Sequence, residues 1–339
     1  MIPLPPSAQH TRPKAALLTK AIPLGYAYDE ATLASLAQLL ELKLASPGST
    51  TAPAPDPDAE LILSGWGMPR MDERFFEQFP HVRAVFYAGG SIRSFMTDTA
   101  WDRGVRVTSA ASVNARPVAE FTFAQIVLSL KCVFAQSRDC RANRRFARQP
   151  GRIPGAFGST VGLISLGEIG RMVAQRLTQL EVQVVAFDPY TPPSRAAEYG
   201  VTLLPLEEVF ARSDVVSCHA PLLPTTTRLI RGEHLAKLPP QATFINTSRG
   251  AVVAEDELIE VLQRRPDLTA LLDVTDPEPP SSDSPLFTLP NVFLTPHISG
   301  SVDRECHRMG HFVLEEVQRY LRGEPLLGEV TRARAERMA

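Results

Sequence analysis

Three residues in the second half of the chain carry side chains that could act together on a small carboxylic acid. Arg249 lies in Phe-Ile-Asn-Thr-Ser-Arg-Gly, Glu278 in Leu-Asp-Val-Thr-Asp-Pro-Glu-Pro, and His297 in Leu-Thr-Pro-His-Ile-Ser-Gly. An arginine can bind a carboxylate through two parallel hydrogen bonds, a glutamate can orient an imidazole and favour its charged form, and a histidine can move a proton near neutral pH. Given a hydride donor, these are the groups that reduction of a 2-keto acid needs.

Each of the three residues also has an ordinary structural explanation. A strand-end arginine is usually part of a surface ion pair, a histidine after proline is usually a loop residue, and a glutamate in a proline-rich loop is usually exposed. Their joint occurrence, in this order and in these contexts, favours the catalytic interpretation. The sequence has no HExxH motif, CxxC pair or acidic cluster, so we expect no catalytic metal.

A hydride donor would bind the segment 160–170, which has the sequence of a strand, a tight turn and a helix start. In the dinucleotide fingerprint one glycine lets the backbone approach the pyrophosphate and the next allows close packing of helix on strand. Gly167 and Gly170 occupy these positions, but Ser165 stands where the glycine of the tight turn is usual.

Asp188 follows Gly170 at close to the roughly 20-residue spacing at which an acid binds the ribose hydroxyls. A carboxylate there would repel a 2′-phosphate, so the sequence favours NAD(H) over NADP(H). The alternative is a simple turn residue, since Asp-Pro pairs favour turns.

The wider pattern alternates short apolar runs with helical segments, which is typical of doubly wound parallel sheets. Strands are expected at 14–18, 61–63, 82–87, 160–165, 182–187, 215–218, 243–246, 270–272 and 292–294. Helices are expected at 30–42, 118–129, 170–180 and 302–321.

The bulk composition is that of an ordinary globular protein. The 339 residues, with 44% hydrophobic and 21% charged residues, are enough for two domains with sizeable cores. A net charge of -2 argues against a nucleic-acid binder, and no apolar run reaches the length of a membrane span. Four cysteines without paired spacing and an N-terminus without a signal-peptide pattern predict a cytoplasmic protein.

Several motifs in one order identify a family. The chain resembles the D-isomer-specific 2-hydroxyacid dehydrogenases from about residue 61 to 330, and most strongly over 158–300. The segments that carry the resemblance are 161–170, Cys-His-Ala-Pro-Leu at 218–222, 244–250, 272–279 and 295–300.

The resemblance implies a role for each catalytic residue. Arg249 would bind the substrate carboxylate and carbonyl oxygen and stabilise the developing alkoxide. His297 would donate the proton during reduction, and Glu278 would hold its ring. The implied enzyme is an NAD-dependent D-2-hydroxyacid dehydrogenase acting on a glyoxylate, hydroxypyruvate or other small 2-keto acid.

The same resemblance assigns the cofactor and substrate contacts. Asp273 would meet the nicotinamide end of NAD(H), and the backbone at Ala88, Gly89 and Gly90 would bind the substrate carboxylate. His219 would line the cofactor site. The remaining expected cofactor-binding residues are Gly167, Glu168, Ile169, Asp188, Thr247, Ser248 and Gly300.

Two residues near the expected substrate loop have open assignments. Trp66 could form a wall of the substrate pocket or pack in the core. Arg93 could bind a second anionic group of a substrate, although an exposed ion pair is the commoner role for such a residue.

The resemblance also implies an architecture of two Rossmann-like domains with a cleft between them. Residues 1–113 and 303–339 would form a discontinuous substrate domain, and residues 114–302 would form the NAD-binding domain. Family members are commonly homodimers joined through the nucleotide domain, and the apolar segment 118–129 would suit such burial.

Other functions remain possible on this scaffold. An NAD(H)-sensing binding protein, like the corepressors that resemble this family, would retain the same residues. Formate oxidation is less favoured, because the sequence shows no sign of that subgroup's extended N-terminal insertions.

Overall fold

The computed structural model describes residues 12–18, 24–43, 56–146, 151–336 and 338. The N-terminal residues 1–11, on which the expectation about a signal peptide rests, lie outside the described residues. The chain forms two compact units, Met1–Asn114 with Val302–Glu336 (unit 1) and Ala115–Ser301 (unit 2). The assignment of these units as substrate and nucleotide domains stays a prediction.

Unit 1 is built on a six-stranded sheet. Its strand order is β13-β5-β4-β3-β1-β2, and every pairing is parallel except that of β13 with β5. The strands are β1 (Lys14–Leu18), β2 (Glu41–Lys43), β3 (Leu61–Ser64), β4 (Ala84–Tyr87), β5 (Arg106–Ser109) and β13 (Glu329–Val330). The helices are α1 (Glu30–Leu39), α2 (Glu73–Gln78), α3 (Asp98–Asp102), α11 (His307–Leu321) and α12 (Arg332–Ala335), with 3-10 turns at Leu24–Tyr26 and Asp303–Cys306.

The core of unit 1 joins segments from the two ends of the chain. Leu36 of α1 and Met309, Val313 and Val317 of α11 pack with buried strand residues such as Phe86. On the same helix, the fully buried Glu316 accepts hydrogen bonds from the backbone N–H groups of residues 327 and 328, each at 2.9 Å. Glu316 therefore fixes the turn that leads into β13.

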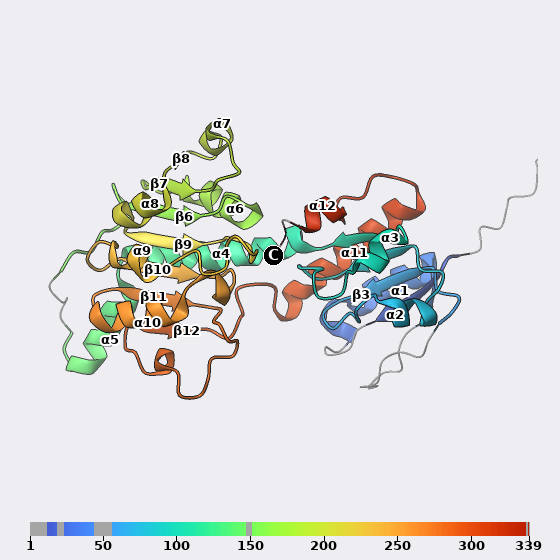
Figure 1. Ribbon diagram of the computed structural model, residues 1–339, viewed down its shortest axis with the longest axis horizontal. Coiled ribbons are helices and arrows are strands. Elements are labelled where there is room, and N and C mark those ends of the chain that lie inside the picture. The colour runs from blue at the N-terminus through green and yellow to red at the C-terminus, as the bar shows by residue number, and fades with distance from the viewer. Residues whose placement is uncertain (1–11, 19–23, 44–55, 147–150, 337, 339) are drawn as a thin grey trace, which may run out of the picture. The chain divides into compact units, whose positions relative to one another are not determined.

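Unit 2 contains a seven-stranded, all-parallel sheet of order β12-β11-β10-β9-β6-β7-β8, which Figure 1 shows as a continuous stack. The strands are β6 (Thr160–Ile164), β7 (Gln183–Phe187), β8 (Val201–Leu203), β9 (Val215–Cys218), β10 (Thr243–Asn246), β11 (Thr269–Leu272) and β12 (Val292–Leu294). The helices are α4 (Ala111–Leu130, which belongs to unit 2 from Ala115 on), α5 (Val133–Asn143), α6 (Glu168–Leu177), α7 (Pro193–Ala197), α8 (Leu206–Arg212), α9 (Gly232–Ala236) and α10 (Glu255–Arg264), with 3-10 turns at Gly250–Val252 and Pro285–Phe287.

Alternating residues of these strands face two separate cores. Val215, Ile245 and Leu271 pack with α4 and α6, whereas Val216 and Phe244 pack with α8, α9 and α10. Helices therefore cover both faces of the sheet, which explains why its strands read as continuous apolar runs. The predicted fold class, two parallel α/β units of Rossmann type, is confirmed.

All four expected helices have different bounds in the structure. The helix expected over 170–180 is α6, which begins at Glu168 and ends at Leu177. The helix expected over 30–42 ends at Leu39, because residues 41–43 pair with β1 as the edge strand β2. The helix expected over 302–321 begins with a 3-10 turn, Asp303–Cys306, before α11. The segment 118–129 lies inside α4, a helix that begins before Pro117.

Candidate active site

The expected contact between His297 and Glu278 is present, and its role in acid–base catalysis stays a prediction. His297 Nδ1 lies 2.6 Å from Glu278 Oε1, and both side chains are a little less than half exposed. With Nδ1 against the carboxylate, Nε2 is the nitrogen that remains to exchange a proton with a bound molecule. Glu278 follows β11 and His297 follows β12, so the carboxyl ends of two adjacent parallel strands bring the pair together.

The loop that carries His297 is shaped by Asp273, whose side chain is buried. The Asp273 carboxylate accepts hydrogen bonds from Thr295 Oγ1 at 2.6 Å and from the backbone N–H groups of residues 298 and 299, both at 2.9 Å. The His297 N–H donates to the Asp273 carbonyl at 3.0 Å, and His297 itself has a φ of 54°. This left-handed conformation is uncommon for a residue with a side chain, and Asp273 holds the neighbouring backbone that fixes it.

Arg249 follows β10, the next strand in the sheet, and is half-buried. Burial lowers the pKa of its guanidinium, and the negative charge of Glu278 acts in the opposite direction. One guanidinium nitrogen donates to the Ser248 carbonyl at 2.7 Å, and Asn246 Nδ2 donates to the Arg249 carbonyl at 3.0 Å. An anion bound beside this partly desolvated cation would be favoured.

The turn after β6 has the geometry of a dinucleotide-binding turn. Ser165 has a φ of 80°, a conformation that glycine adopts most readily. A Cβ at Gly170 would lie 2.2 Å from the Ser165 carbonyl oxygen, so only glycine fits there. At Gly167, the N-cap of α6, the nearest atom to an added Cβ is Ser165 Oγ at 3.8 Å. Glu168 and Ile169 are the first two residues of α6, and their contact with a pyrophosphate stays a prediction.

Asp188, expected at the ribose, also organises this turn. Its Oδ2 accepts a hydrogen bond from the Leu166 N–H at 2.6 Å, and its Oδ1 accepts from the N–H groups of Tyr190 and Thr191 at 2.8 and 2.9 Å. The strand-end turn role that the sequence left open is therefore present. Binding of ribose by Asp188 stays a prediction.

His219 follows β9, which neighbours β6 at the point where the strand order reverses. The side chain is buried, neither ring nitrogen has a hydrogen-bond partner among the described residues, and burial lowers the pKa to about 3. Its Cβ lies 3.9 Å from the place of a Cβ on Gly170. A buried, unpartnered imidazole beside a glycine turn at a topological switch point fits a bound dinucleotide.

The other expected cofactor residues lie on loops of unit 2. Thr247 and Ser248 directly follow β10, where Thr247 Oγ1 lies 3.0 Å from Thr122 Oγ1 and Ser248 Oγ lies 3.3 Å from Cys218 Sγ. Gly300 follows the Asp273-bound loop at residues 298 and 299. Cofactor contact by these residues stays a prediction.

The expected substrate loop lies in unit 1, directly after β4. The Ser109 hydroxyl is within hydrogen-bonding distance of the Gly89 carbonyl, at 3.0 Å, and of the Gly90 carbonyl. A Cβ at Gly89 would lie 2.6 Å from the Tyr87 ring, so this residue has no room for a side chain. Ala88 is fully buried at the end of the strand. The loop is thus supported from β5, but its contact with a substrate stays a prediction.

Trp66 and Arg93, the two residues of unit 1 whose roles the sequence leaves open, both have defined contacts. Trp66 packs edge-to-face on Tyr26 with ring centroids 6.1 Å apart, at the border of the apolar core. Arg93 is exposed and donates a hydrogen bond to the Glu336 carbonyl at 3.0 Å.

Two further supports, Ser109 and Glu255, were not predicted. Glu255 Oε2 accepts a hydrogen bond from the Asp276 N–H at 2.8 Å, two residues before Glu278. No local pattern could have revealed either contact. For Glu255, an acid in the first turn of a helix usually complements the helix dipole, and the contact of Ser109 joins two separate strand ends.

Within the described ranges, no group of three His, Cys, Asp or Glu side chains is placed to hold a metal ion. Among the same residues, no single helix is long and apolar enough to cross a membrane, and one bent pair, α4 with α5 at 57°, passes that test of length and composition together.

Comparisons with known proteins agree with the geometry. Residues 123–299 match the NAD binding domain of the D-isomer specific 2-hydroxyacid dehydrogenases. The chain is 36% identical over 273 residues to the D-3-phosphoglycerate dehydrogenase of Mycobacterium tuberculosis, a match that covers 80% of this chain and 51% of that protein. It thus spans about half the length of the phosphoglycerate dehydrogenases that it matches.

A second relative and a solved structure match over more of their own length. The chain is 32% identical to the glyoxylate reductase of Korarchaeum cryptofilum, over 75% of this chain and 77% of that protein. The structure of a D-isomer specific 2-hydroxyacid dehydrogenase from Xanthobacter autotrophicus, in complex with NADPH and MES, aligns with a TM-score of 0.77 at 26% identity and covers 96% of this chain and 100% of that one. The chain belongs to the D-isomer-specific 2-hydroxyacid dehydrogenase family.

Proposed function

We propose that this protein is an NAD(H)-dependent oxidoreductase that interconverts a small 2-keto acid and the corresponding D-2-hydroxy acid. The observation that carries the proposal is the 2.6 Å contact of His297 with Glu278, on the loops next to Arg249 in the strand order of the sheet. These groups provide a proton donor, its charged partner and an anion-binding cation at one edge of the sheet. An NAD(H)-sensing binding protein on this scaffold could carry the same pair, so turnover is the property that separates the two functions.

When bound, NADH would supply the hydride that the carbonyl carbon of the acid accepts in the proposed reaction. Arg249 binds the substrate carboxylate and the carbonyl oxygen, and its positive charge stabilises the negative charge that grows on that oxygen. His297 delivers the proton from Nε2 to the same oxygen, so that C=O becomes CH–OH. Glu278 stabilises the imidazolium before transfer and keeps the ring oriented through Nδ1.

Residues of the expected cofactor set would hold the nucleotide. The N-terminus of α6 with Gly167, Glu168 and Ile169 would bind the pyrophosphate. Asp188 would accept hydrogen bonds from the adenosine ribose hydroxyls, which favours NADH over NADPH. In unit 1, the backbone of Ala88, Gly89 and Gly90 would bind the substrate carboxylate.

The acid itself is identified by a substrate screen. NADH oxidation should be followed with glyoxylate, hydroxypyruvate, pyruvate, phenylpyruvate and 2-ketoisocaproate, and NAD⁺ reduction with D-3-phosphoglycerate, because relatives carry the names glyoxylate reductase and D-3-phosphoglycerate dehydrogenase. His297→Gln is the control for contaminating activity. His311→Gln is its matched variant, because it makes the same substitution at an exposed histidine of α11. If none of the acids turns over while NADH binds, the corepressor-like binding protein becomes the better proposal.

We also propose a cytoplasmic homodimer joined through unit 2. Leu128 and Val133 are exposed apolar residues on α4 and α5, and Phe146 is exposed just beyond α5. The four cysteines all lie in described segments and none forms a disulfide, as expected in a reducing compartment. Light scattering should give twice the monomer mass for the wild type and the monomer mass for Val133→Glu. Leu321→Glu, at an exposed apolar residue of α11 in unit 1, is the control and should also give twice the monomer mass. A monomeric wild type would contradict the dimer.

A further inference from the structure

The loop that carries Glu278 has limited support of its own. It runs from β11 to the proline-rich segment around Pro279, and residues 276–279 are exposed. Within it, Thr275 Oγ1 donates to the Pro277 carbonyl at 2.8 Å. The position of the Glu278 carboxylate therefore depends on what holds residues 275 and 276 from outside the loop.

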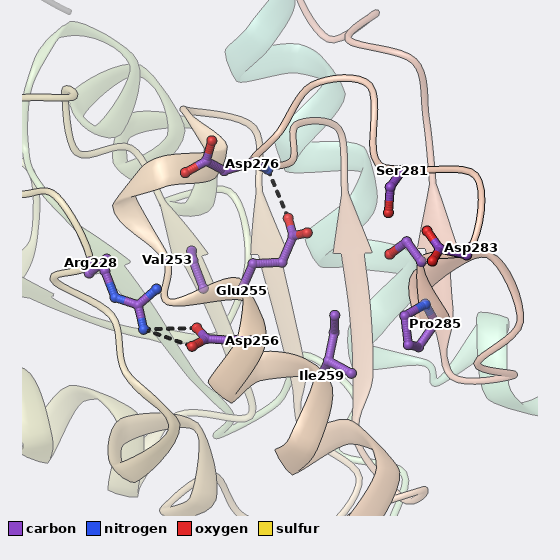
Figure 2. Close-up of a pocket in the computed structure, with 10 residues that line it drawn as sticks. Arg228, Val253, Glu255, Asp256, Ile259, Asp276, Ser281, Asp283 and Pro285 are labelled. Carbon is purple, nitrogen blue, oxygen red and sulfur yellow. Dashed lines mark hydrogen bonds and ion pairs between the residues drawn. The ribbon is translucent and has the colours of Figure 1, made fainter.

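Glu255, the first residue of α10, provides such a hold. Its Oε2 accepts a hydrogen bond from the Asp276 N–H at 2.8 Å, as Figure 2 shows. The half-buried Glu255 side chain crosses from the helix to the loop beside a cavity of about 350 Å³. A hydrogen bond to an ionised acceptor is stronger than one between neutral groups, so this contact is a strong restraint on the loop.

The neighbouring acid, Asp256, has a different partner. Its two carboxylate oxygens lie 2.8 and 3.1 Å from Arg228 Nη2, and Figure 2 shows this pair at the lower left, away from Asp276. Asp256 is exposed and adds the same charge to the same turn of α10, but no hydrogen bond joins it to the loop of Glu278. It is therefore a matched control for Glu255.

We propose that Glu255 is a positioning residue that holds the loop at Asp276 and thereby places Glu278 against His297. The proposal rests on the function proposed above, since its effect is read through turnover. Within the described structure, Glu255 itself makes no hydrogen bond to Glu278 or His297.

The charges around Glu255 show which interaction favours its ionised form. Burial raises the pKa of Glu255, the Asp276 N–H lowers it, and the negative charges of Asp276 and Asp256 raise it further. Asp283 and Arg228 are the other charged groups around the cavity. Of these interactions, the hydrogen bond from the Asp276 N–H is the one that favours the ionised form of Glu255.

The first experiment compares Glu255→Ala, Glu255→Gln and Asp256→Ala. Glu255→Ala removes the acceptor and should lower kcat for keto-acid reduction by about tenfold, with NADH Kd unchanged. Glu255→Gln retains an acceptor oxygen and should keep most of kcat, and Asp256→Ala should match the wild type. Should Glu255→Ala melt below the assay temperature, Glu255→Asp replaces it, because a carboxylate one methylene shorter cannot reach Asp276 without movement of the loop.

The second experiment separates positioning of Glu278 from general damage. If Glu255 acts through Glu278, Glu255→Ala should change kcat by less than about twofold once Glu278→Gln is present. The alkaline fall of the reduction rate should also move to lower pH in Glu255→Ala, in the direction of Glu278→Gln, because a displaced carboxylate stabilises the imidazolium less. Independent effects of the two substitutions on kcat would overturn the proposal. Absence of turnover in the wild type would instead refute the proposed function.

Discussion

Gly250 approaches Thr275 so closely that a Cβ on residue 250 would lie 2.0 Å from both the carbonyl carbon and the carbonyl oxygen of Thr275. Gly250 directly follows Arg249, and Thr275 lies three residues before Glu278. This contact therefore sets the distance between the segment that carries the arginine and the loop that carries the glutamate.

Gly250→Ala should damage turnover more than folding. The added methyl group has no room beside the Thr275 backbone, so one of the two segments must move. We expect kcat/KM to fall by roughly 10²-fold, and Tm to fall by a few degrees. Gly25→Ala, where nothing lies within 4 Å of the added Cβ, is the control and should leave both unchanged. Full kcat/KM in Gly250→Ala would show that the spacing of the two segments does not matter.

The roles of His297 and Arg249 should separate in steady-state kinetics. His297→Ala removes the proton donor and should lower kcat by roughly 10²–10⁴-fold while NADH still binds. Arg249→Ala should reduce kcat and raise KM together, because the guanidinium would bind both the ground-state carboxylate and the developing alkoxide. Near-full turnover in His297→Ala would exclude His297 as the acid.

Cofactor preference tests Asp188. The wild type should use NADH at least roughly tenfold better than NADPH in kcat/KM, about 1.4 kcal/mol. Asp188→Ser with Pro189→Arg should shift this ratio toward NADPH. Because Asp188 also accepts three backbone hydrogen bonds, the double variant should lose stability, and the ratio of the two cofactors is the measure to use. Pro189→Arg alone is the control, and a wild type that prefers NADPH would contradict the assignment.

Ser165 occupies a backbone position that suits glycine. Its φ of 80° is strained for a residue with a side chain, and its hydroxyl lies 3.4 Å from Asp188 Oδ2, a long hydrogen bond. Ser165→Gly should therefore be tolerated, with NADH Kd unchanged or modestly lower by fluorescence titration. Ser165→Ala, which keeps the strain and removes the hydroxyl, is the partner variant. A marked rise of Kd in both variants would show that the hydroxyl binds the cofactor.

His219 should make the fold sensitive to acid. Burial lowers its pKa to about 3, whereas the unfolded chain takes up the proton near pH 6.5. Between these values the unfolded state binds more protons, so stability from this group is complete above about pH 6.5 and falls by up to about 1.4 kcal/mol per pH unit below it. Urea denaturation at pH 7, 6 and 5 should show a smaller pH dependence for His219→Gln than for the wild type, with His311→Gln resembling the wild type. Equal slopes for all three proteins would contradict the prediction.

Much of unit 2 could be predicted because its signals are local. Strands such as Val215–Cys218 and Thr243–Asn246 are apolar runs bounded by turn residues, and both faces of the sheet are covered. The pairing of Glu278 with His297 was also predicted, because each residue lies in a motif that fixes its place at a strand end.

The remaining features depend on contacts between distant segments. The edge strands Glu41–Lys43 and Glu329–Val330 are too short to show a period, and they form because β1 and β5 offer free edges. The contacts of Glu255 with Asp276 and of Ser109 with Gly89 join segments about 20 residues apart, so neither leaves a pattern in the sequence.

The two hydrogen bonds that the buried Glu316 accepts have a consequence for synthesis of the chain. Glu316 and its neighbours on α11 complete the core of unit 1, yet they leave the ribosome after every residue of unit 2. Unit 2 can therefore fold while translation continues, whereas residues 12–113 must wait with an open apolar surface until α11 emerges. Truncation before residue 307 should leave unit 2 able to fold and unit 1 dependent on chaperones.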